Sequence, residues 1–160
     1  MASREEYCTY GFFEKRDLVA ALGTLEHRRV VLFGSSLGAA VALQAAPLEP
    51  RVCGVIAEAP FASLESIVRD RAPWFATKSE VGGALRLAGE RGRFRVDEVS
   101  PEAAARGHPR ARAPDPRCGR PRDRAGHSRR IEAALAGPKQ LLLVPGAATA
   151  ARSRGPRPGG

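Results

Sequence analysis

Apolar residues recur along the chain with two different periods, and the alternation of these periods predicts an α/β protein with a parallel sheet. Short aliphatic and β-branched runs predict three buried strands, at 29–33, 52–57 and 139–144. Apolar residues at helical spacing, and a proline-initiated turn before the third segment, predict helices at 14–25, 37–45, 60–66 and 79–91. Prolines at 47 and 50 end the second of these helices.

Two stretches of the chain carry no apolar run at all. Residues 107–126 and 148–160 are instead rich in arginine, proline, glycine and alanine. Such stretches cannot bury enough surface to offset the entropy lost on ordering. We therefore expect one domain at 1–147, in which 107–126 is an unstructured, insertion-like segment, followed by a disordered basic tail at 148–160.

The formal net charge of +9 is concentrated in the same regions. Residues 1–105 contain 13 basic and 14 acidic side chains, whereas residues 106–130 contain nine arginines and only two acids, and residues 151–160 add three arginines. A nucleic-acid-binding face would instead place basic side chains on a folded surface. The distribution therefore argues against nucleic acid as a specific partner.

The cysteines and the apolar runs bear on compartment and cofactors. Cys8, Cys53 and Cys118 are far apart and form no C-x-x-C pair, so neither a zinc site nor a disulfide framework is expected. There is no run of 18 apolar residues to span a membrane, and the first residues lack the apolar segment of a secretory signal. We expect a cytoplasmic protein with no membrane partner, no metal and no cofactor, of unknown oligomeric state.

The candidate chemistry lies in Gly34-Ser35-Ser36-Leu37-Gly38, which fits G-x-S-x-G. The motif follows a predicted strand directly and opens a predicted helix, as a nucleophile elbow requires. Such a turn strains the serine backbone and leaves its hydroxyl free, while glycine fits the crowded positions on either side. We predict Ser36 as the nucleophile, the Leu37 N–H as an oxyanion donor, and Gly34 and Gly38 as the structural elbow. The alternative is an ordinary Gly/Ser-rich turn, such as one that binds phosphate, although no P-loop lysine is present.

Longer runs around this motif resemble the α/β-hydrolase superfamily. They read T-Y-G-F-F-E-K-R-D-L-V-A-A-L (9–22), V-V-L-F-G-S-S-L-G-A-A-V-A-L-Q-A-A (30–46) and V-C-G-V-I-A-E-A-P-F-A-S-L (52–64). The sequence is most similar to the bacterial serine-hydrolase branch of the dipeptidyl aminopeptidase and acylaminoacyl peptidase type, and the similarity continues in V-D-E-V-S-P-E-A-A-A-R (96–106) and after His127.

This resemblance implies a partial α/β-hydrolase fold with a small parallel sheet and flanking helices. The strands at 29–33, 52–57 and 139–144 would be the fifth, sixth and eighth of that fold. It also implies an esterase or peptidase activity that passes through an acyl-enzyme.

The chain departs from the family pattern at three places. The early strands, and the loop that supplies the second oxyanion-hole amide, would lie upstream of Tyr10, where only nine residues stand. The seventh strand and its H-G-x-x-D aspartate would follow Arg106, where the arginine-rich segment stands. The triad histidine would follow Pro145-Gly146-Ala147, where Ala148-Thr149 stands. The acid and the base therefore remain unknown.

A change of reading frame accounts for the last two departures. The codons of His108 to Arg124, read one nucleotide later, can encode I-R-V-P-V-L-L-I-H-G-A-A-D-R-E-T, which contains the missing strand and its aspartate. In that frame Asp115-Pro116 permits only isoleucine or threonine. Near the C-terminus, Ala147–Thr149 read from the third base of Ala147 can encode Gly-His. We infer that both basic segments are translated in the wrong frame and that the chain is an N-terminally truncated member of the family.

Asp123 and His127 offer a second arrangement, because the order Ser36, Asp123, His127 matches the family order of nucleophile, acid and base. We do not assign this triad. Asp123 lies in the segment without a predicted strand, and His127 opens H-S-R-R-I, which resembles the start of a helix away from the active site.

The remaining candidate residues have structural interpretations. Glu58 follows a strand end, but its E-A-P-F context is typical of a structural turn in this branch. His27 precedes a strand, at the end of the sheet opposite to the chemistry of open α/β sheets. Cys53 is expected in the core, and Trp74 and Phe75 fit a cap over a substrate pocket as well as a core or surface position.

The sequence thus predicts a serine hydrolase that cleaves ester or amide bonds of a small-molecule or peptide substrate, impaired by the missing triad partners. The rival is a non-catalytic remnant or a basic protein that contacts nucleic acid or anionic surfaces. Fluorophosphonate labelling of Ser36 would favour the enzyme, and a steep salt dependence of nucleic-acid retention would favour the binder.

Overall fold

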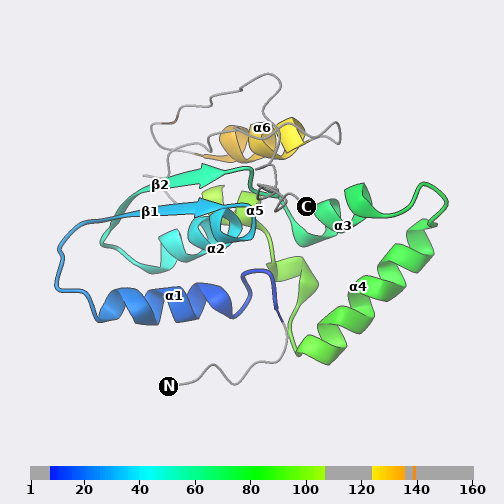
Figure 1. Cartoon of the computed structure of the whole chain (residues 1–160), viewed down its shortest axis with the longest axis horizontal. Coiled ribbons are helices and arrows are strands. Elements are labelled where there is room, and N and C mark those ends of the chain that lie inside the picture. Colours follow the sequence, from blue (N-terminus) through cyan, green and yellow to red (C-terminus); the bar gives the residue numbers. More distant parts are fainter. Residues whose placement is uncertain (1–7, 107–123, 136–138, 140–160) are drawn as a thin grey trace, which may run out of the picture.

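A computed structural model of the chain describes residues 8–106, 124–135 and 139 (Figure 1). Within these residues two strands, β1 (Val30–Ser35) and β2 (Val52–Glu58), pair in parallel. Gly34 lies opposite Ala57 and Ser35 lies opposite Glu58, so both strands end at the same edge. The two strands occupy the positions that the sequence predicts, and their parallel pairing confirms the expected α/β class.

Helices precede, connect and follow these two strands along the chain. They are α1 (Glu14–Gly23), α2 (Leu37–Ala45), α3 (Leu64–Arg71), α4 (Lys78–Gly92), α5 (Pro101–Arg106) and α6 (Arg124–Ala134), with short 3-10 turns η1 (Ala46–Leu48) and η2 (Val96–Glu98). The sequence predicts α1, α2 and α4 to within two residues at each end. The helix predicted at 60–66 begins only at residue 64, because the Ser63 hydroxyl accepts the Ser66 N–H and thereby caps α3 at that point.

Several predictions fall outside the described residues. The strand predicted at 139–144 lies outside them except for Lys139, and so do the tail at 148–160 and most of the segment at 107–126. The last three residues of that segment were expected to lack regular structure, which is wrong, because 124–126 form the first turn of α6. The helix begins there because Ile131 and Leu135 farther along are buried in the core and hold it in place.

The core lies between the strands and the helix that connects them. Leu32, Val55 and Ala57 are buried against α2, whose buried side chains include Ala42 and Leu43. Small side chains along α2 let this helix approach both strands closely, and α1 and α5 pack on its other sides. Packing against α5 brings the buried residues of α6 into the same cluster.

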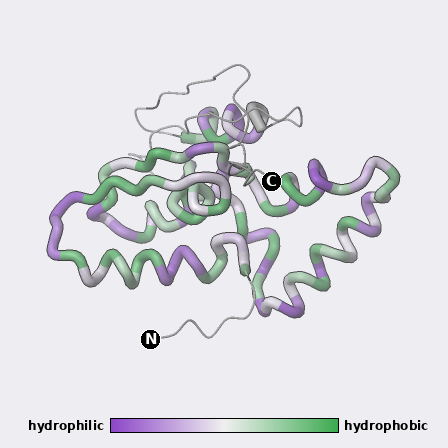
Figure 2. The backbone as a smooth tube through the Cα atoms, in the orientation of Figure 1, coloured by the Kyte–Doolittle hydropathy of each residue, from purple (hydrophilic) through white to green (hydrophobic). Residues whose placement is uncertain are grey.

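The opposite face of the strand pair stays apolar and open. Val31, Phe33 and Ile56 are 56%, 71% and 43% exposed, and Figure 2 shows the hydrophobic character of both strands. The sequence predicts strands buried on both faces, and for this face the prediction is wrong. Successive side chains of a strand alternate between faces, and only the face toward α2 is covered by described residues.

A second apolar cluster lies on the far side of α2, where α3 and α4 form an arm that extends from the strands (Figure 1). Its buried members are Ala40, Phe61, Leu64, Val81, Leu85, Phe94 and Val99. The Thr77 hydroxyl accepts the Glu80 N–H and starts α4, just as Ser63 starts α3. Capping thus fixes where each helix of the arm begins, and the apolar cluster holds the arm against α2.

An ion pair ties the end of α1 to the start of β2. The Arg51 guanidinium donates to both carboxylate oxygens of Glu49, at 3.0 and 2.9 Å, and to the carbonyls of Leu22 and Leu25, each at 2.8 Å. These hydrogen bonds satisfy two carbonyls at the C-terminal end of α1. The hydrogen bonds from Arg51 lower the pKa of Glu49 to about 2.

We expect Glu49→Gln to remove a pH-dependent part of the stability. The pKa of Glu49 is lower in the folded chain than in the unfolded one, so its contribution is complete above the unfolded value near ~4.3 and is lost as pH falls toward 2. The variant should therefore be less stable than the parent at pH 7, and the difference should shrink progressively between pH 4.5 and 2. Urea unfolding at four pH values measures this, with the exposed Glu90→Gln as control. A difference that stays constant with pH would contradict the assignment.

No helix among the described residues is long and apolar enough to cross a membrane.

Candidate active site

Ser36 occupies the turn between β1 and α2, where the sequence predicts the elbow. Its backbone angles are φ 52° and ψ −110°, a region that non-glycine residues rarely adopt. The Ser36 N–H donates to the Glu58 carbonyl at 2.8 Å, and the Ser36 carbonyl accepts the Ala40 N–H at 3.1 Å. One hydrogen bond thus holds the turn to the end of β2 and the other holds it to the first turn of α2. Backbone strain of this kind costs on the order of 1–3 kcal/mol and is concentrated at functional sites.

The two glycines of the motif differ in how closely they are packed. A Cβ at Gly34 would lie 2.4 Å from the Gly38 carbonyl carbon and oxygen and 2.6 Å from the Ala39 nitrogen, all of them backbone atoms. A Cβ at Gly38 would meet nothing within 4 Å. The prediction that both positions are crowded therefore holds for Gly34 and is wrong for Gly38, because only Gly34 has α2 crossing directly over it.

The polar groups at this turn are open for chemistry. In the described part of the chain the Ser36 hydroxyl makes no capping hydrogen bond to α2, and the side chain is half-buried. Leu37 is the first residue of α2, so its N–H has no partner within the helix and lies at the positive end of the helix dipole. A hydroxyl and an amide donor therefore lie next to each other at the helix N-terminus, a suitable place for a developing negative charge.

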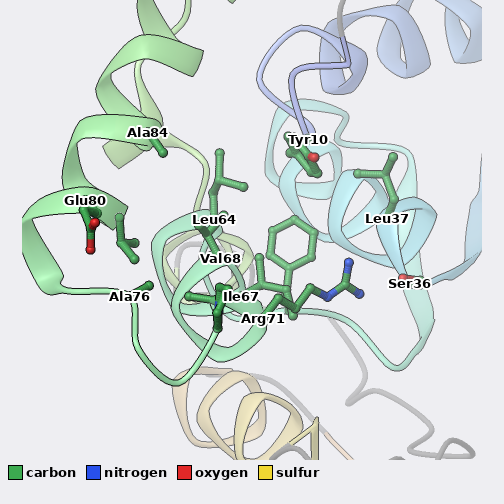
Figure 3. A pocket seen from close by; sticks show the side chains of 14 residues that line it. Tyr10, Ser36, Leu37, Leu64, Ile67, Val68, Arg71, Ala76, Glu80 and Ala84 are labelled. Carbon is green, nitrogen blue, oxygen red and sulfur yellow. The ribbon is translucent and has the colours of Figure 1, made fainter.

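A cavity of about 440 Å³ opens beside Ser36 and Leu37 (Figure 3). Apolar side chains of the arm form most of its wall, among them Leu64, Ile67 and Val68 from α3 and Val81 from α4. The arm therefore provides a space for an apolar group next to the Ser36 hydroxyl. Such a space is the usual form of a small-molecule site.

Tyr10 closes the cavity on the side of the elbow (Figure 3). Its loop is held by the Glu14 carboxylate, which accepts the Thr9 N–H at 2.7 Å, the Thr9 hydroxyl at 2.6 Å and the Gly11 N–H at 2.8 Å. Burial alone would raise the pKa of Glu14, but these hydrogen bonds outweigh it and the pKa is lowered. The loop has positive φ at Tyr10 (58°) and Gly11 (106°), and the Gln44 amide donates to the Tyr10 carbonyl at 3.3 Å.

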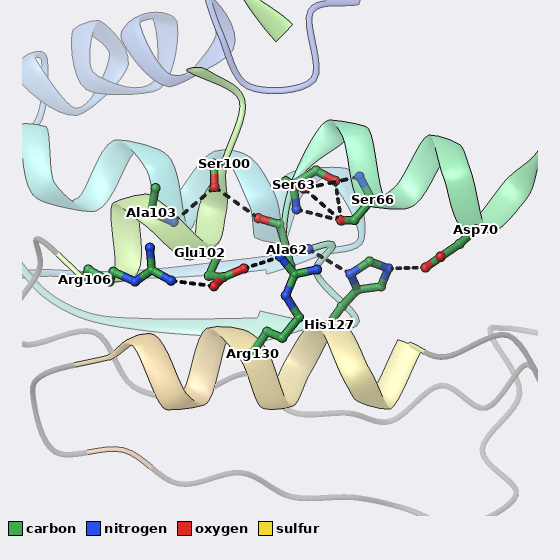
Figure 4. Close-up of polar contacts among 10 residues, drawn as sticks. All are labelled: Ala62, Ser63, Ser66, Asp70, Ser100, Glu102, Ala103, Arg106, His127 and Arg130. Atoms are coloured by element: carbon green, nitrogen blue, oxygen red, sulfur yellow. Dashed lines mark hydrogen bonds and ion pairs between the residues drawn. The ribbon is translucent and has the colours of Figure 1, made fainter. Parts of the chain in front are cut away.

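His127 lies in α6 with both ring nitrogens engaged (Figure 4). It is 4% exposed; Nδ1 accepts the Ala62 N–H at 3.2 Å, and Nε2 lies 2.8 Å from Asp70 Oδ2. Acceptance from a backbone amide assigns the proton to Nε2, which then donates to Asp70. Both ring nitrogens therefore already have partners, and neither is available to take a proton from Ser36. This geometry gives no support to His127 as the base. Asp123, the acid of that alternative triad, lies outside the described residues.

The other candidate residues lie apart from the cavity wall. Glu58 ends β2 and contributes its carbonyl to the elbow, and His27 is exposed before β1. Cys53 is half-buried rather than in the core, and it lies at the irregularity of the strand pairing, where Val30 pairs with Val52 and Val31 with Gly54. Trp74 and Phe75 are 94% and 70% exposed in the link between α3 and α4, so the structure places them at the tip of the arm.

Among residues 8–106, 124–135 and 139, no group of three or more His, Cys, Asp or Glu side chains is arranged to hold a metal ion. The parallel strands joined by a helix, with a strained serine at the turn beside an apolar cavity, define the class of protein as an α/β fold. The description of the matching family is "Alpha/beta hydrolase family", and its model matches residues 4–158. The chain belongs to the alpha/beta hydrolase family.

One solved structure shows the same fold. The chain is similar to acetyl xylan esterase 1 from Thermoanaerobacterium sp. JW/SL YS485, with a TM-score of 0.58 and 20% identity over 89% of this chain and 48% of that chain. A second similar structure is an acylaminoacyl peptidase from Pyrococcus horikoshii, with a TM-score of 0.46 and 16% identity over 81% of this chain and 21% of that chain. No protein with curated function matches the sequence significantly. The chain spans about half the length of acetyl xylan esterase 1.

Two residues of the cavity, Arg71 and Tyr10, are absent from the candidates that the sequence provides. Arg71 ends α3 and lines the cavity, and Figure 3 shows its guanidinium extended toward Ser36 and Leu37. The only sequence signal for Arg71 is a basic residue in the last turn of a helix, which is common at helix ends. Its proximity to Ser36 depends on how the arm packs, which no local pattern reveals.

Proposed function

We propose that this chain acts as a serine hydrolase on ester or amide bonds. The observation that carries the proposal is the strained Ser36, whose hydroxyl lies at the N-terminus of α2 beside an apolar cavity. Membership of the alpha/beta hydrolase family and the fold shared with an acetyl xylan esterase support it. The substrate is a small-molecule ester, amide or peptide whose apolar part fits the arm.

The reaction follows from the groups at the elbow. Ser36 Oγ attacks the carbonyl carbon of the substrate and releases its hydroxyl proton to water, and the oxygen of that carbonyl becomes negative and accepts a hydrogen bond from the Leu37 N–H. Collapse of this intermediate expels the alcohol or amine, which takes up a proton, and leaves Ser36 acylated. Water then attacks the acyl group and releases the acid, which regenerates the Ser36 hydroxyl.

Slow turnover is part of the proposal. A base that takes the serine proton and an acid that orients the base each contribute orders of magnitude to such a reaction. In the described part of the chain no histidine or carboxylate is hydrogen-bonded to the Ser36 hydroxyl, and His127 is committed to Ala62 and Asp70. Among the groups in the described part of the chain, Ser36 therefore has its backbone geometry and the Leu37 N–H to support its reaction.

Covalent labelling tests the proposal directly. We expect an alkyl fluorophosphonate to modify Ser36, because its hydroxyl is the reacting group at the elbow, and to do so slowly. Mass spectrometry of the digested protein locates the adduct and follows its rate. Ser36→Ala should remove the adduct, whereas Ser35→Ala, which changes the adjacent serine of the same motif, should retain it. An adduct that persists in Ser36→Ala, or that never forms at millimolar probe, would refute the proposal.

A further inference from the structure

We infer that Arg71 selects substrates that carry a carboxylate close to the scissile ester or amide bond. The inference rests on the proposed function of Ser36 and adds a substrate class to it. It identifies Arg71 as a specificity-determining residue on α3.

Among the described residues that line the cavity, only Arg71 and Glu80 carry full charges. Glu80 is already used for structure: its carboxylate accepts the Thr77 N–H at 2.7 Å and the Thr77 hydroxyl at 2.8 Å, and these bonds lower its pKa. Glu80 also lies across the cavity from Ser36, on the first turn of α4 (Figure 3). It therefore neither neutralises Arg71 nor contributes charge at the reacting end.

The Arg71 side chain makes no hydrogen bond or ion pair with any residue that the structure describes. Its neighbour on the same helix, Arg69, forms an ion pair with Glu65 at 2.7 Å and is absent from the cavity wall. Both arginines can interact with the dipole at the end of α3, but only Arg71 extends over the cavity toward Ser36 and Leu37 (Figure 3). The position of Arg71 thus goes beyond what the helix end requires.

A guanidinium in this position favours a planar anion. Its N–H groups form a fork that matches the two oxygens of a carboxylate, and the surrounding apolar wall strengthens such a pair relative to open water. The cavity then has two functions: its aliphatic wall takes the apolar body of the substrate, and Arg71 takes a carboxylate near the bond that Ser36 attacks. Esters of dicarboxylic acids and amides of amino acids with a free carboxylate share this chemistry.

The test compares two p-nitrophenyl esters of similar size, the neutral butyrate and the anionic hemisuccinate. We expect kcat/KM, or the rate of the first acylation if turnover is slow, to favour the hemisuccinate. Arg71 lies at the rim of the cavity, where solvent weakens its attraction for a carboxylate. Arg71→Met should therefore reduce the hemisuccinate rate by about fivefold to tenfold. The butyrate rate should stay unchanged. Arg69→Met is the matched control and should alter neither ester.

A binding measurement separates this inference from the proposed function. In Ser36→Ala, the dissociation constant of hexanoate should rise about fivefold when Arg71→Met is added, while that of hexan-1-ol should not change; ligand-observed NMR measures both. If no ester is cleaved but hexanoate binding depends on Arg71, the proposed function fails and the carboxylate site stands. If hexanoate binding is indifferent to Arg71, the inference fails whatever Ser36 does. If Arg71→Met reduced the rates of both esters equally, Arg71 would instead stabilise the oxyanion of the reaction, and the inference would be overturned.

Discussion

Gly34→Ala should destabilise the chain by roughly 3 kcal/mol and largely abolish fluorophosphonate labelling of Ser36. The new Cβ would lie 2.4 Å from backbone atoms of Gly38, and backbone cannot rotate away as a side chain can. The start of α2 would have to move away from β1. This movement would displace the Leu37 N–H and the Ser36 hydroxyl from the positions in which both can face one substrate carbonyl. Urea unfolding followed by circular dichroism gives the stability, and the labelling rate gives the effect on the site.

Gly38→Ala is the matched control for this change. Its Cβ would meet no neighbour within 4 Å, and alanine is the better helix former by ~1 kcal/mol. Stability should therefore be unchanged or higher, with labelling retained. Equal losses in the two variants would show that the close contact between Gly34 and α2 is not what forms the elbow.

Completing the catalytic groups should raise turnover of a p-nitrophenyl ester by about 10³-fold to 10⁴-fold. The present chain should hydrolyse such an ester only slowly. In the completed protein, residues 108–124 and 147–149 are each replaced by the translation of their own shifted frame. The strands and the oxyanion loop of the family are added upstream. We expect the frame change alone to help less than the full completion, because it adds the acid and the base but no second oxyanion amide. Stopped-flow release of p-nitrophenolate measures both steps.

Three results would contradict this expectation. In the completed version Ser36→Ala should abolish the gain, and a gain that survives would exclude Ser36 as its source. Sequencing the native gene should reveal the frame changes, and an uninterrupted reading in the present frame would remove their basis. If the chain as written already turned over at ~10 per second and lost this activity on His127→Ala, His127 would be the base after all.

The local parts of the fold could be predicted from the sequence. The elbow depends on five consecutive residues between an aliphatic run and a run of small residues, so Ser36 falls on the turn for reasons that lie within the motif. The strand and helix periods placed β1, β2, α2 and α4 for the same reason. The unequal packing of Gly34 and Gly38, however, depends on the angle at which α2 crosses β1. The residue spacing of the motif does not determine that angle.

Features formed by distant segments could not be predicted. Hydrophobic runs 29–33 and 52–57 indicate strands but not which elements cover them, so the exposure of Phe33 and Ile56 was missed. Arg71 lies 35 positions after Ser36 in the sequence and comes to the cavity only because α3 packs on the second apolar cluster. The fixation of His127 by Ala62 and Asp70 likewise depends on the packing of α6 against the rest of the chain.

The contacts of His127 have a consequence for the order in which the chain folds. Its partner Ala62 lies 65 positions earlier in the sequence, and its other partner, Asp70, lies 57 positions earlier on the helix that forms the cavity wall. Pairings across such separations require a large loop to close, and they form late. During synthesis the elbow, with its short-range contacts between β1, α2 and β2, can form first. The buried imidazole of His127, which contacts α3 through Asp70, is synthesised after the elbow and the arm, so the contact that fixes this wall of the cavity forms late in folding.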